Sequence, residues 1–196
     1  SLPSPPERPR CSMEKPENFG IYITSYKRAD TITTHKLVEY YKVVIRESEH
    51  DDYLKTIPAE NIIAVQDELI DSVPKVWNWI IDNAAEDCFC IIGDDVPRFY
   101  YRMEKSEAIS DPEIITSEIE RIGQLMLDLD IGWGCDDATN VPWGYDCEFA
   151  FKGTTGGINW VNRNKLKARF NADIGYCCDT DVVMQELLVN RIILKP

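Results

Sequence analysis

Short runs of apolar residues, separated by charged and polar stretches, recur along the first half of the chain. Runs rich in β-branched and aromatic residues predict strands at 19–25, 41–45, 61–65 and 88–92, with shorter strands at 98–102 and 192–194. The run at 88–92 is Cys-Phe-Cys-Ile-Ile and carries no charge. Such a run is typical of a strand that is buried on both faces of a parallel sheet.

Other segments have apolar residues at helical spacing. A helix is predicted at 31–40, with Asp30 or Thr31 as its N-cap. Ser72 and Pro74 open another, with an apolar face formed by Trp77, Ile80, Ile81 and Ala84. Asp111-Pro112-Glu113 starts the clearest helix, whose stripe is Ile115, Ile119, Ile122, Met126 and Leu129. Asp179-Thr180-Asp181 opens the last, which is expected to bury Val183, Leu187 and Leu188.

Strands that alternate with helices predict an α/β fold with a mixed, mostly parallel sheet flanked by helices. We expect a single domain at 19–196. Residues 1–18 include five prolines and little that could pack, so they predict a disordered arm, a linker or a remnant of cloning.

The net charge is -13, from 34 acidic and 21 basic residues, which argues against broad nonspecific binding of nucleic acid. Seven cysteines without zinc-type spacing indicate reduced thiols. No apolar run approaches the ~20 residues of a membrane span. With no visible signal peptide, these features predict a cytoplasmic protein, in the host cytoplasm if the source is viral.

Asp94 and Asp95 follow the buried strand at 88–92 directly after Gly93. Ligands of open α/β sheets bind at the carboxyl ends of the strands. Adjacent carboxylates repel each other unless a positive charge lies between them, and Mg²⁺ or Mn²⁺ prefers such oxygen ligands. The pair is therefore a candidate metal site, although an acidic turn at the end of a strand is the alternative interpretation.

Several motifs in order resemble a GT-A fold glycosyltransferase, and most of all the phage TET-associated glycosyltransferases. They are the strand and loop at 21–28, Val76-Trp77-Asn78-Trp79-Ile80, Gly93-Asp94-Asp95, Gly156-Gly157-Ile158-Asn159 and Asp179-Thr180-Asp181-Val182. The resemblance covers about residues 19–194. It implies a metal-dependent enzyme of hexosyltransferase type that moves a sugar from a nucleotide donor, expected to be a UDP-sugar, to a hydroxyl. Hydroxymethylated pyrimidine in DNA is the acceptor that it implies.

The resemblance also assigns residues to roles. Asp94 and Asp95 would bind Mn²⁺ or Mg²⁺. The nucleotide would be bound by Thr24, Ser25, Tyr26, Arg28, Asn78 and Asp94. Asp179 or Asp181 would take the proton of the acceptor hydroxyl, as a general base does. The sequence departs from the family at Gly93, where aspartate is usual, at Trp77, where arginine is usual, and at Cys178, where glutamate is frequent.

Each assignment has a structural alternative. Asp179 and Asp181 also suit ordinary helix capping, and Lys27-Arg28 suits a solvated turn. The basic residues Arg163, Lys165, Lys167 and Arg169 either contact DNA or balance nearby acids. A nucleotidyltransferase is the alternative enzyme, although 24–27 lacks the glycine-rich phosphate loop expected of it. A non-catalytic module that binds a nucleotide or a partner is the third hypothesis.

Overall fold

The structure is a computed structural model that describes residues 18–102, 106–136, 149–153, 156–174 and 177–196. Nearly all of the predicted arm at 1–18 therefore lies outside the described residues. The strands are β1 (Phe19–Thr24), β2 (Lys42–Arg46), β3 (Ile62–Val65), β4 (Cys88–Gly93), β5 (Phe99–Arg102), β6 (Ser106–Ile109), β7 (Trp133–Cys135) and β8 (Ile158–Asn162). The α-helices are α1 (His50–Tyr53), α2 (Val73–Asn83), α3 (Pro112–Asp128) and α4 (Cys178–Val189). Short 3-10 helices are η1 (Thr34–Lys36), η2 (Glu47–Glu49), η3 (Ala59–Asn61) and η4 (Asp67–Leu69).

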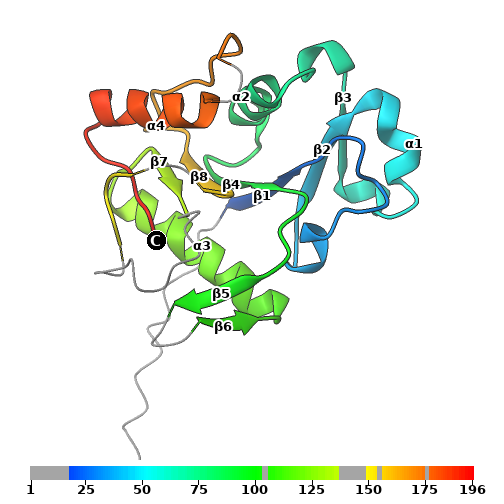
Figure 1. Cartoon of the computed structure of the whole chain (residues 1–196), viewed down its shortest axis with the longest axis horizontal. Coiled ribbons are helices and arrows are strands. Elements are labelled where there is room, and N and C mark those ends of the chain that lie inside the picture. The colour runs from blue at the N-terminus through cyan, green and yellow to red at the C-terminus, as the bar shows by residue number, and fades with distance from the viewer. Residues whose placement is uncertain (1–17, 103–105, 137–148, 154–155, 175–176) are drawn as a thin grey trace, which may run out of the picture.

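Six strands form one mixed sheet in the order β3-β2-β1-β4-β8-β7 (Figure 1). The strands β1 to β4 are parallel, whereas β8 pairs antiparallel with both β4 and β7. The strands β5 and β6 form a separate antiparallel hairpin directly after the acidic pair. The predicted mixed, mostly parallel α/β sheet is therefore confirmed.

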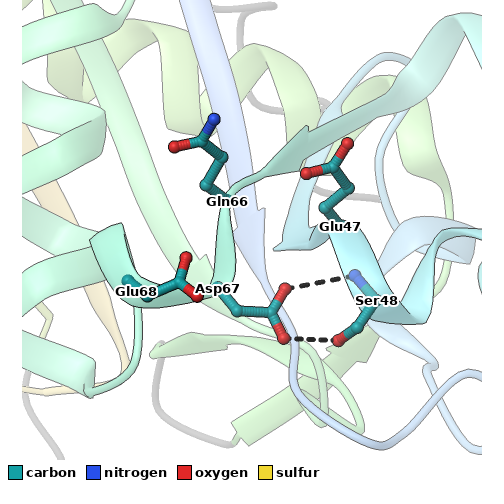
Figure 2. A pocket seen from close by; sticks show the side chains of 5 residues that line it. All are labelled: Glu47, Ser48, Gln66, Asp67 and Glu68. Carbon is teal, nitrogen blue, oxygen red and sulfur yellow. Dashed lines mark hydrogen bonds between the residues drawn. The ribbon is translucent and has the colours of Figure 1, made fainter.

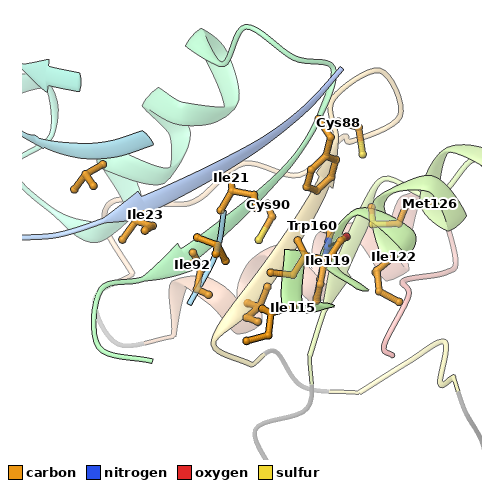
Figure 3. Packing of buried hydrophobic residues seen from close by; sticks show 14 of the residues in the cluster. Ile21, Ile23, Cys88, Cys90, Ile92, Ile115, Ile119, Ile122, Met126 and Trp160 are labelled. Atoms are coloured by element: carbon orange, nitrogen blue, oxygen red, sulfur yellow. Dashed lines mark hydrogen bonds between the residues drawn. The ribbon is translucent and has the colours of Figure 1, made fainter. Parts of the chain in front are cut away.

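Helices cover both faces of the sheet, with α3 on one side and α2 and α4 on the other (Figure 1). Alternate residues of each strand point to opposite faces, so Cys88, Cys90 and Ile92 pack toward α3 while Phe89 and Ile91 pack toward α2 and α4. Figure 3 shows the first of these layers, in which strand residues contact a stripe along α3. The stripe consists of Ile115, Ile119, Ile122 and Met126. Burial of β4 on both faces explains why its sequence is an unbroken apolar run.

Two of the four predicted long helices begin as the sequence indicates. The carboxylate of Asp111 accepts a hydrogen bond of 3.0 Å from the Glu113 amide, which is the predicted N-cap of α3. Ser72 precedes α2 and Pro74 lies in its first turn. In α4 the N-cap is Cys177, so Asp179 and Asp181 lie within the first turn.

Three local predictions are wrong. The segment predicted as a helix at 31–40 forms only the short η1, and its Thr33 and Thr34 donate hydrogen bonds to the end of β4. Leu188 and Leu129, with 63% and 53% of their surfaces exposed, are not part of the core, although both were predicted to be buried. The tail at 192–194 forms isolated bridges and not a strand, with Leu194 beside Gly134.

Two further features concern the chain as a whole. The cysteines in the described ranges are free thiols, namely Cys88, Cys90, Cys135, Cys177 and Cys178. Burial raises the pKa of the Cys88 thiol to about 12 and that of Cys90 well above its usual value, so both stay protonated and pack as apolar groups. Within the ranges that the structure describes, no helix is both long enough and apolar enough to span a bilayer.

Candidate functional site

The carboxyl ends of the parallel strands meet at one edge of the sheet. Thr24 lies opposite Gly93 in the register of β1 and β4, so Ser25 and Asp94 follow side by side. Because β8 runs antiparallel and Ile158 pairs with Ile92, the predicted acceptor loop Gly156-Gly157 precedes β8 at the same edge. The topology thus brings together three motifs that are up to about 130 residues apart in the sequence.

The side chain of Arg28 lies between the two aspartates. Its Nη1 atom is 3.1 Å from Oδ1 of Asp94 and 2.6 Å from Oδ2 of Asp95. The Asp94 side chain is 8% exposed, whereas those of Asp95 and Arg28 are 68% and 49% exposed. The hydrogen bond to Asp95 is the main cause that raises the pKa of the Arg28 guanidinium. The positive charge that the acidic pair requires is therefore supplied here by a side chain of the protein.

A chain of hydroxyl groups holds the second oxygen of Asp94. The Ser25 hydroxyl donates to Oδ2 of Asp94, and the Ser25 and Tyr53 hydroxyl oxygens are 2.5 Å apart. The Arg28 amide donates to the Tyr53 oxygen at 3.2 Å. Because the single O–H of Ser25 donates its hydrogen bond to Asp94, the Tyr53 hydroxyl is the donor in its bond with Ser25. Each donor in the chain is oriented toward the carboxylate, an arrangement that stabilises its negative charge.

Tyr53 was not identified from the sequence. Its side chain is fully buried, and this burial raises the pKa of its hydroxyl. It lies in the four-residue helix α1, within an irregular polar stretch that has no motif or periodicity. Only its hydrogen bonds to the turn after β1 show that it supports the site.

The backbone around Asp94 is fixed by the segment that was expected to be a helix. The amides of Thr33 and Thr34 donate to the Asp94 carbonyl at 2.9 and 3.3 Å. The Thr34 hydroxyl donates to the Gly93 carbonyl at 2.7 Å and accepts from the Val96 amide at 3.0 Å. These hydrogen bonds hold the segment against the end of β4, and they set the direction in which Asp94 leaves the sheet.

The turn after β1 carries the remaining predicted nucleotide residues. Thr24 ends β1, and Tyr26 is 45% exposed, with the Arg46 guanidinium 4.0 Å above its ring. Lys27 has a φ of 56°, a left-handed conformation that is uncommon for residues other than glycine, and its amide donates to Glu49 at 2.8 Å. This tight turn directs Arg28 back toward the acidic pair. Arg46, at the end of β2, is a second cation at this edge that sequence analysis did not assign.

Asn78 is placed differently from the other predicted nucleotide residues. It lies in the middle of α2, where its amide group donates to the Phe170 carbonyl at 2.8 Å and accepts from the Phe170 amide at 2.9 Å. Both polar atoms of this side chain therefore connect α2 to the segment before α4. This role positions a neighbouring element and does not bring Asn78 to Ser25 or Asp94.

Asp179 and Asp181 begin α4 on the face of the sheet that α2 also covers. Asp179 accepts from the Thr180 amide at 2.7 Å, and Asp181 accepts from Gln185 at 2.7 Å. Further along α4, buried Glu186 lies against Gly132, which precedes β7. This contact places the second half of α4 beside the start of β7. Asp179 and Asp181 lie in the first turn of the helix, where their carboxylates are engaged in local hydrogen bonds.

A hollow of about 540 Å³ lies where β2 and β3 end. It is lined by Glu47, Ser48, Gln66, Asp67 and Glu68 (Figure 2). The Ser48 amide and hydroxyl donate to Asp67 at 3.1 and 2.5 Å, which lowers the pKa of that carboxyl. Adjacent strands are about 4.8 Å apart, so this hollow is roughly two strands, or about 10 Å, from the gap between β1 and β4. The hollow and the acidic pair therefore share one edge.

Asp136 and Gly156 complete this edge beside β8. The Asp136 carboxylate accepts from the Ile158 amide at 2.7 Å, and a Cβ atom on Gly156 would collide with Asp136. Glycine is thus required at position 156. At Gly93, in contrast, an added Cβ would make only an ordinary contact, at 3.5 Å from Asp95.

The basic cluster at 163–169 lies at the other edge of the sheet. Asn162, which ends β8, pairs with Cys88 at the start of β4, and Arg163 binds Asp87 at 3.0 Å. Lys165 binds Asp130 at 2.6 Å, and Arg169 binds Asp82 at 3.3 Å. Three members of the cluster therefore balance nearby acids, the second of the two interpretations that the sequence allows. With a strand rise of about 3.3 Å, the length of β4 separates this edge from Asp94 by roughly 20 Å.

The donor set at the acidic pair suits a hard divalent cation. Asp94 and Asp95 present two carboxylate oxygens to one point, the position of the Arg28 Nη1 atom. Over the described part of the chain, no group of three His, Cys, Asp or Glu side chains is arranged to bind a metal. Mg²⁺ and Mn²⁺ need no such group, because they retain water and are bound by one or two carboxylates together with phosphate oxygens of the substrate.

Comparison with models of known protein families gives no match, and comparison with curated proteins gives none either. Among solved structures, the chain is similar to the mannosyltransferase PcManGT from Pyrobaculum calidifontis in complex with GDP-Man and Mn²⁺. The TM-score is 0.59 at 13% identity, over 91% of this chain and 54% of that one. The chain thus spans about half the length of the mannosyltransferase. CMP:2-keto-3-deoxy-manno-octonic acid synthetase complexed with CTP matches with a TM-score of 0.47 at 10% identity, over 91% of this chain and 89% of that one. The first likeness establishes the fold, a GT-A-like Rossmann-type sheet.

Proposed function

We propose that the chain transfers a sugar from a nucleotide-sugar donor to a hydroxyl acceptor and uses a divalent cation held by Asp94 and Asp95. The observation that carries the proposal is the convergence of these carboxylates with Ser25 and Arg28 at the carboxyl edge of the sheet. Ligands of open α/β sheets bind at this edge. When bound, the cation would stabilise the negative charge that develops on the leaving diphosphate.

The arrangement of the edge supports a nucleotide that lies across the strand ends. The hollow beside Glu47 and Gln66 is about 10 Å from the acidic pair along the strand ends. Tyr26 and Arg46 lie between the two, at the ends of β1 and β2. In this arrangement the base occupies the hollow, the ribose lies near Thr24 and Tyr26, and Arg28 contacts the diphosphate.

A screen of several nucleotide sugars can identify both the nucleotide and the sugar of the donor. The resemblance implies a UDP-sugar, and the similar mannosyltransferase was solved with GDP-Man and Mn²⁺, so both belong in the test. A donor that binds the native state raises the melting temperature by mass action. We expect one class of nucleotide sugar to do so with Mn²⁺ and not without it.

The matched variants are Asp95→Asn at the site and Asp87→Asn at the opposite end of β4. Both remove one exposed carboxylate charge, because these side chains are 68% and 62% exposed. We expect Asp95→Asn to abolish the Mn²⁺-dependent shift and Asp87→Asn to retain it. Unchanged affinity of Asp95→Asn in calorimetry would place the cation elsewhere.

The general base is proposed to be Asp179 or Asp181 in the first turn of α4. Both carboxylates lie in the first turn of α4, where a negative charge also stabilises a helix through its dipole, so the test must separate the two roles. A base accelerates proton transfer by about 10²–10⁴-fold, and its loss should lower transfer by that factor with donor affinity unchanged. A change confined to the melting temperature would assign the residue to stabilising the first turn of α4.

Hydroxymethylated pyrimidine in DNA remains the proposed acceptor, on the strength of the resemblance. The basic cluster no longer supports it, because that cluster lies at the opposite edge and is largely paired. The test is to incubate the protein, the identified donor and Mn²⁺ with DNA that carries hydroxymethylated bases, and to weigh the nucleosides after digestion. Transfer to a small sugar or peptide in place of DNA would overturn the acceptor and keep the enzyme class.

The products that are released distinguish a glycosyltransferase from the alternative enzyme, a nucleotidyltransferase. A nucleotidyltransferase would consume a nucleoside triphosphate and a sugar or sugar phosphate and release pyrophosphate, whereas a glycosyltransferase releases a nucleoside diphosphate or monophosphate. Pyrophosphate release from a triphosphate, with no consumption of nucleotide sugar, would favour the nucleotidyltransferase.

A further inference from the structure

One guanidinium nitrogen of Arg28 serves two carboxylates. Nη1 is within hydrogen-bond distance of Asp94 and Asp95 at once, at 3.1 and 2.6 Å. One positive charge therefore faces two negative charges, and the group of three keeps an excess of one negative charge. Arg28 occupies the point at which the two carboxylate oxygens converge, so a cation that binds both aspartates must displace it.

The side chain of Arg28 can leave without movement of its backbone. Its amide donates to Tyr53 at 3.2 Å, and its carbonyl accepts from the amides of Thr31 and Ile32 at 3.0 and 2.9 Å. These bonds fix the main chain on both sides of the residue. The guanidinium itself is at the surface, with half of the side chain exposed, where rotation about its χ angles is unhindered by a core.

Asp94 does not depend on Arg28 alone for its position. The Ser25 hydroxyl holds its second oxygen, and the amides of Thr33 and Thr34 hold its carbonyl. The first oxygen of Asp94 therefore stays directed at the same point when the guanidinium leaves. This support is what allows the exchange of one cation for another at fixed ligand geometry.

We propose, on the basis of the proposed function, that Arg28 is an internal counter-ion that a divalent cation displaces and that then binds the diphosphate delivered with it. Guanidinium groups bind phosphate oxygens through two parallel N–H donors, so the diphosphate replaces the hydrogen bonds that Arg28 loses at the carboxylates. Without the diphosphate, the displaced guanidinium has no such replacement. Arg28 therefore weakens the binding of a bare cation and strengthens that of a cation–diphosphate complex.

The two effects have opposite signs in one variant, Arg28→Gln. A charge-assisted hydrogen bond contributes enough to change an equilibrium about tenfold, so we expect Mn²⁺ alone to bind about tenfold more tightly. The Mn²⁺–pyrophosphate complex is expected to bind about tenfold more weakly. Mn²⁺ binding is followed by electron paramagnetic resonance of the free ion, and binding of the complex by calorimetry.

The matched control is Arg163→Gln, which removes an arginine that also binds an aspartate beside β4. It should change neither affinity by more than about twofold, because roughly 20 Å of β4 separate it from the site. Arg28→Lys keeps the charge but not the paired donors, and should restore weak binding of bare Mn²⁺ more fully than tight binding of the complex. Circular dichroism checks that each variant is folded.

The Mn²⁺ arm uses no nucleotide, so it can fail independently of the proposed function. Unchanged or weaker binding of bare Mn²⁺ by Arg28→Gln would overturn the role of Arg28, even if nucleotide sugars bind. Absence of Mn²⁺ binding in every variant would overturn it as well. Arg28→Gln could bind bare Mn²⁺ more tightly and the Mn²⁺–pyrophosphate complex more weakly, while the wild type binds no nucleotide sugar. That result would support Arg28 as counter-ion and reject nucleotide sugars as donors.

Discussion

The strand β4 begins after one aspartate and ends before another, and an arginine distant in the sequence binds each. At the start, Arg163 binds Asp87 at 3.0 Å and donates to the Ala84 carbonyl at 2.8 Å. At the end, Arg28 divides one nitrogen between Asp94 and Asp95. The first arginine thus faces one carboxylate and the second faces two.

The number of carboxylates per arginine distinguishes the structural ion pair at the start of β4 from the candidate cation site at its end. The ion pair at the start is neutral. Its Arg163, directly after β8, connects Asp87 before β4 with the loop after α2. The end of the strand keeps an uncompensated negative charge, a buried carboxylate and a chain of oriented hydroxyl groups. A position that holds a cation of the protein and still carries excess negative charge has the capacity to exchange that cation for one of higher charge.

The largest expected difference between the two ends is between Asp94→Asn and Asp87→Asn. Asp94→Asn should weaken Mn²⁺-dependent nucleotide binding by about 10- to 100-fold, because a contact with a charged group contributes about 1.5–3 kcal/mol. It should also cost about 1–3 kcal/mol of unfolding free energy, since Ser25 and Arg28 lose a buried charged partner. Asp87→Asn should leave binding within about twofold and stability nearly unchanged, as expected of an exposed pair.

Calorimetry of binding and urea unfolding measure these two quantities on the same samples. Equal affinity of Asp94→Asn and Asp87→Asn for the nucleotide with Mn²⁺ would contradict the prediction. The ratio of carboxylates to arginines at each end of β4 would then have no bearing on ligand binding. Loss of stability in Asp94→Asn without loss of affinity would make the end of β4 a structural pair like its start.

The next expected effect is a loss of stability at alkaline pH. Its cause lies near the start of β4, where the Tyr22 hydroxyl donates to Glu86 at 2.6 Å. Burial, and then this hydrogen bond, raise the pKa of Tyr22 well above 10.0. Folded Tyr22 therefore keeps its proton where the unfolded chain loses it, and the unfolding free energy falls as the pH rises above about 10. Melting temperatures measured from pH 8 to 11 should decline above that point.

Tyr22→Phe is the control for this effect. The variant should be less stable at neutral pH because it lacks the bond to Glu86, but its decline above pH 10 should be shallower. Some decline should persist, because burial also raises the pKa of Tyr40. Parallel curves for the variant and the wild type would contradict the assignment to Tyr22.

Features of β4 and α3 that depend on local sequence could be predicted. The unbroken apolar run of β4 and the capped stripe of α3 were predictable because burial and capping leave periodic local patterns. The acidic pair after β4 was predictable as a candidate site because the carboxyl ends of parallel strands carry function. These features depend on neighbours within a few residues of each other.

The contacts that distinguish the two ends were not predictable in this way. Arg28 lies 66 residues from Asp94, and Arg163 lies 76 residues from Asp87, so no local pattern pairs them. The hydrogen bonds of Thr33 and Thr34 to the end of β4 replaced a predicted helix, because tertiary contacts outweighed weak local propensity. The basic cluster was ambiguous for the same reason, since its acidic partners are Asp82, Asp87 and Asp130, all remote in sequence.

The smallest expected effect is that of removing this cluster, with Arg163, Lys165, Lys167 and Arg169 all changed to Gln. If all four residues bound DNA phosphates, the slope of log affinity against log salt would fall by about 3–4, since each contact contributes about 0.9. We expect a change below about one, because the carboxylates of Asp82, Asp87 and Asp130 already neutralise three of the cations. Fluorescence anisotropy with a labelled hydroxymethylated duplex across a salt series measures the slope, and equally undetectable binding by both proteins agrees with the prediction. A loss of three or more from the slope would instead show that DNA contacts the start of β4, which would require the duplex to reach around the sheet to Asp94.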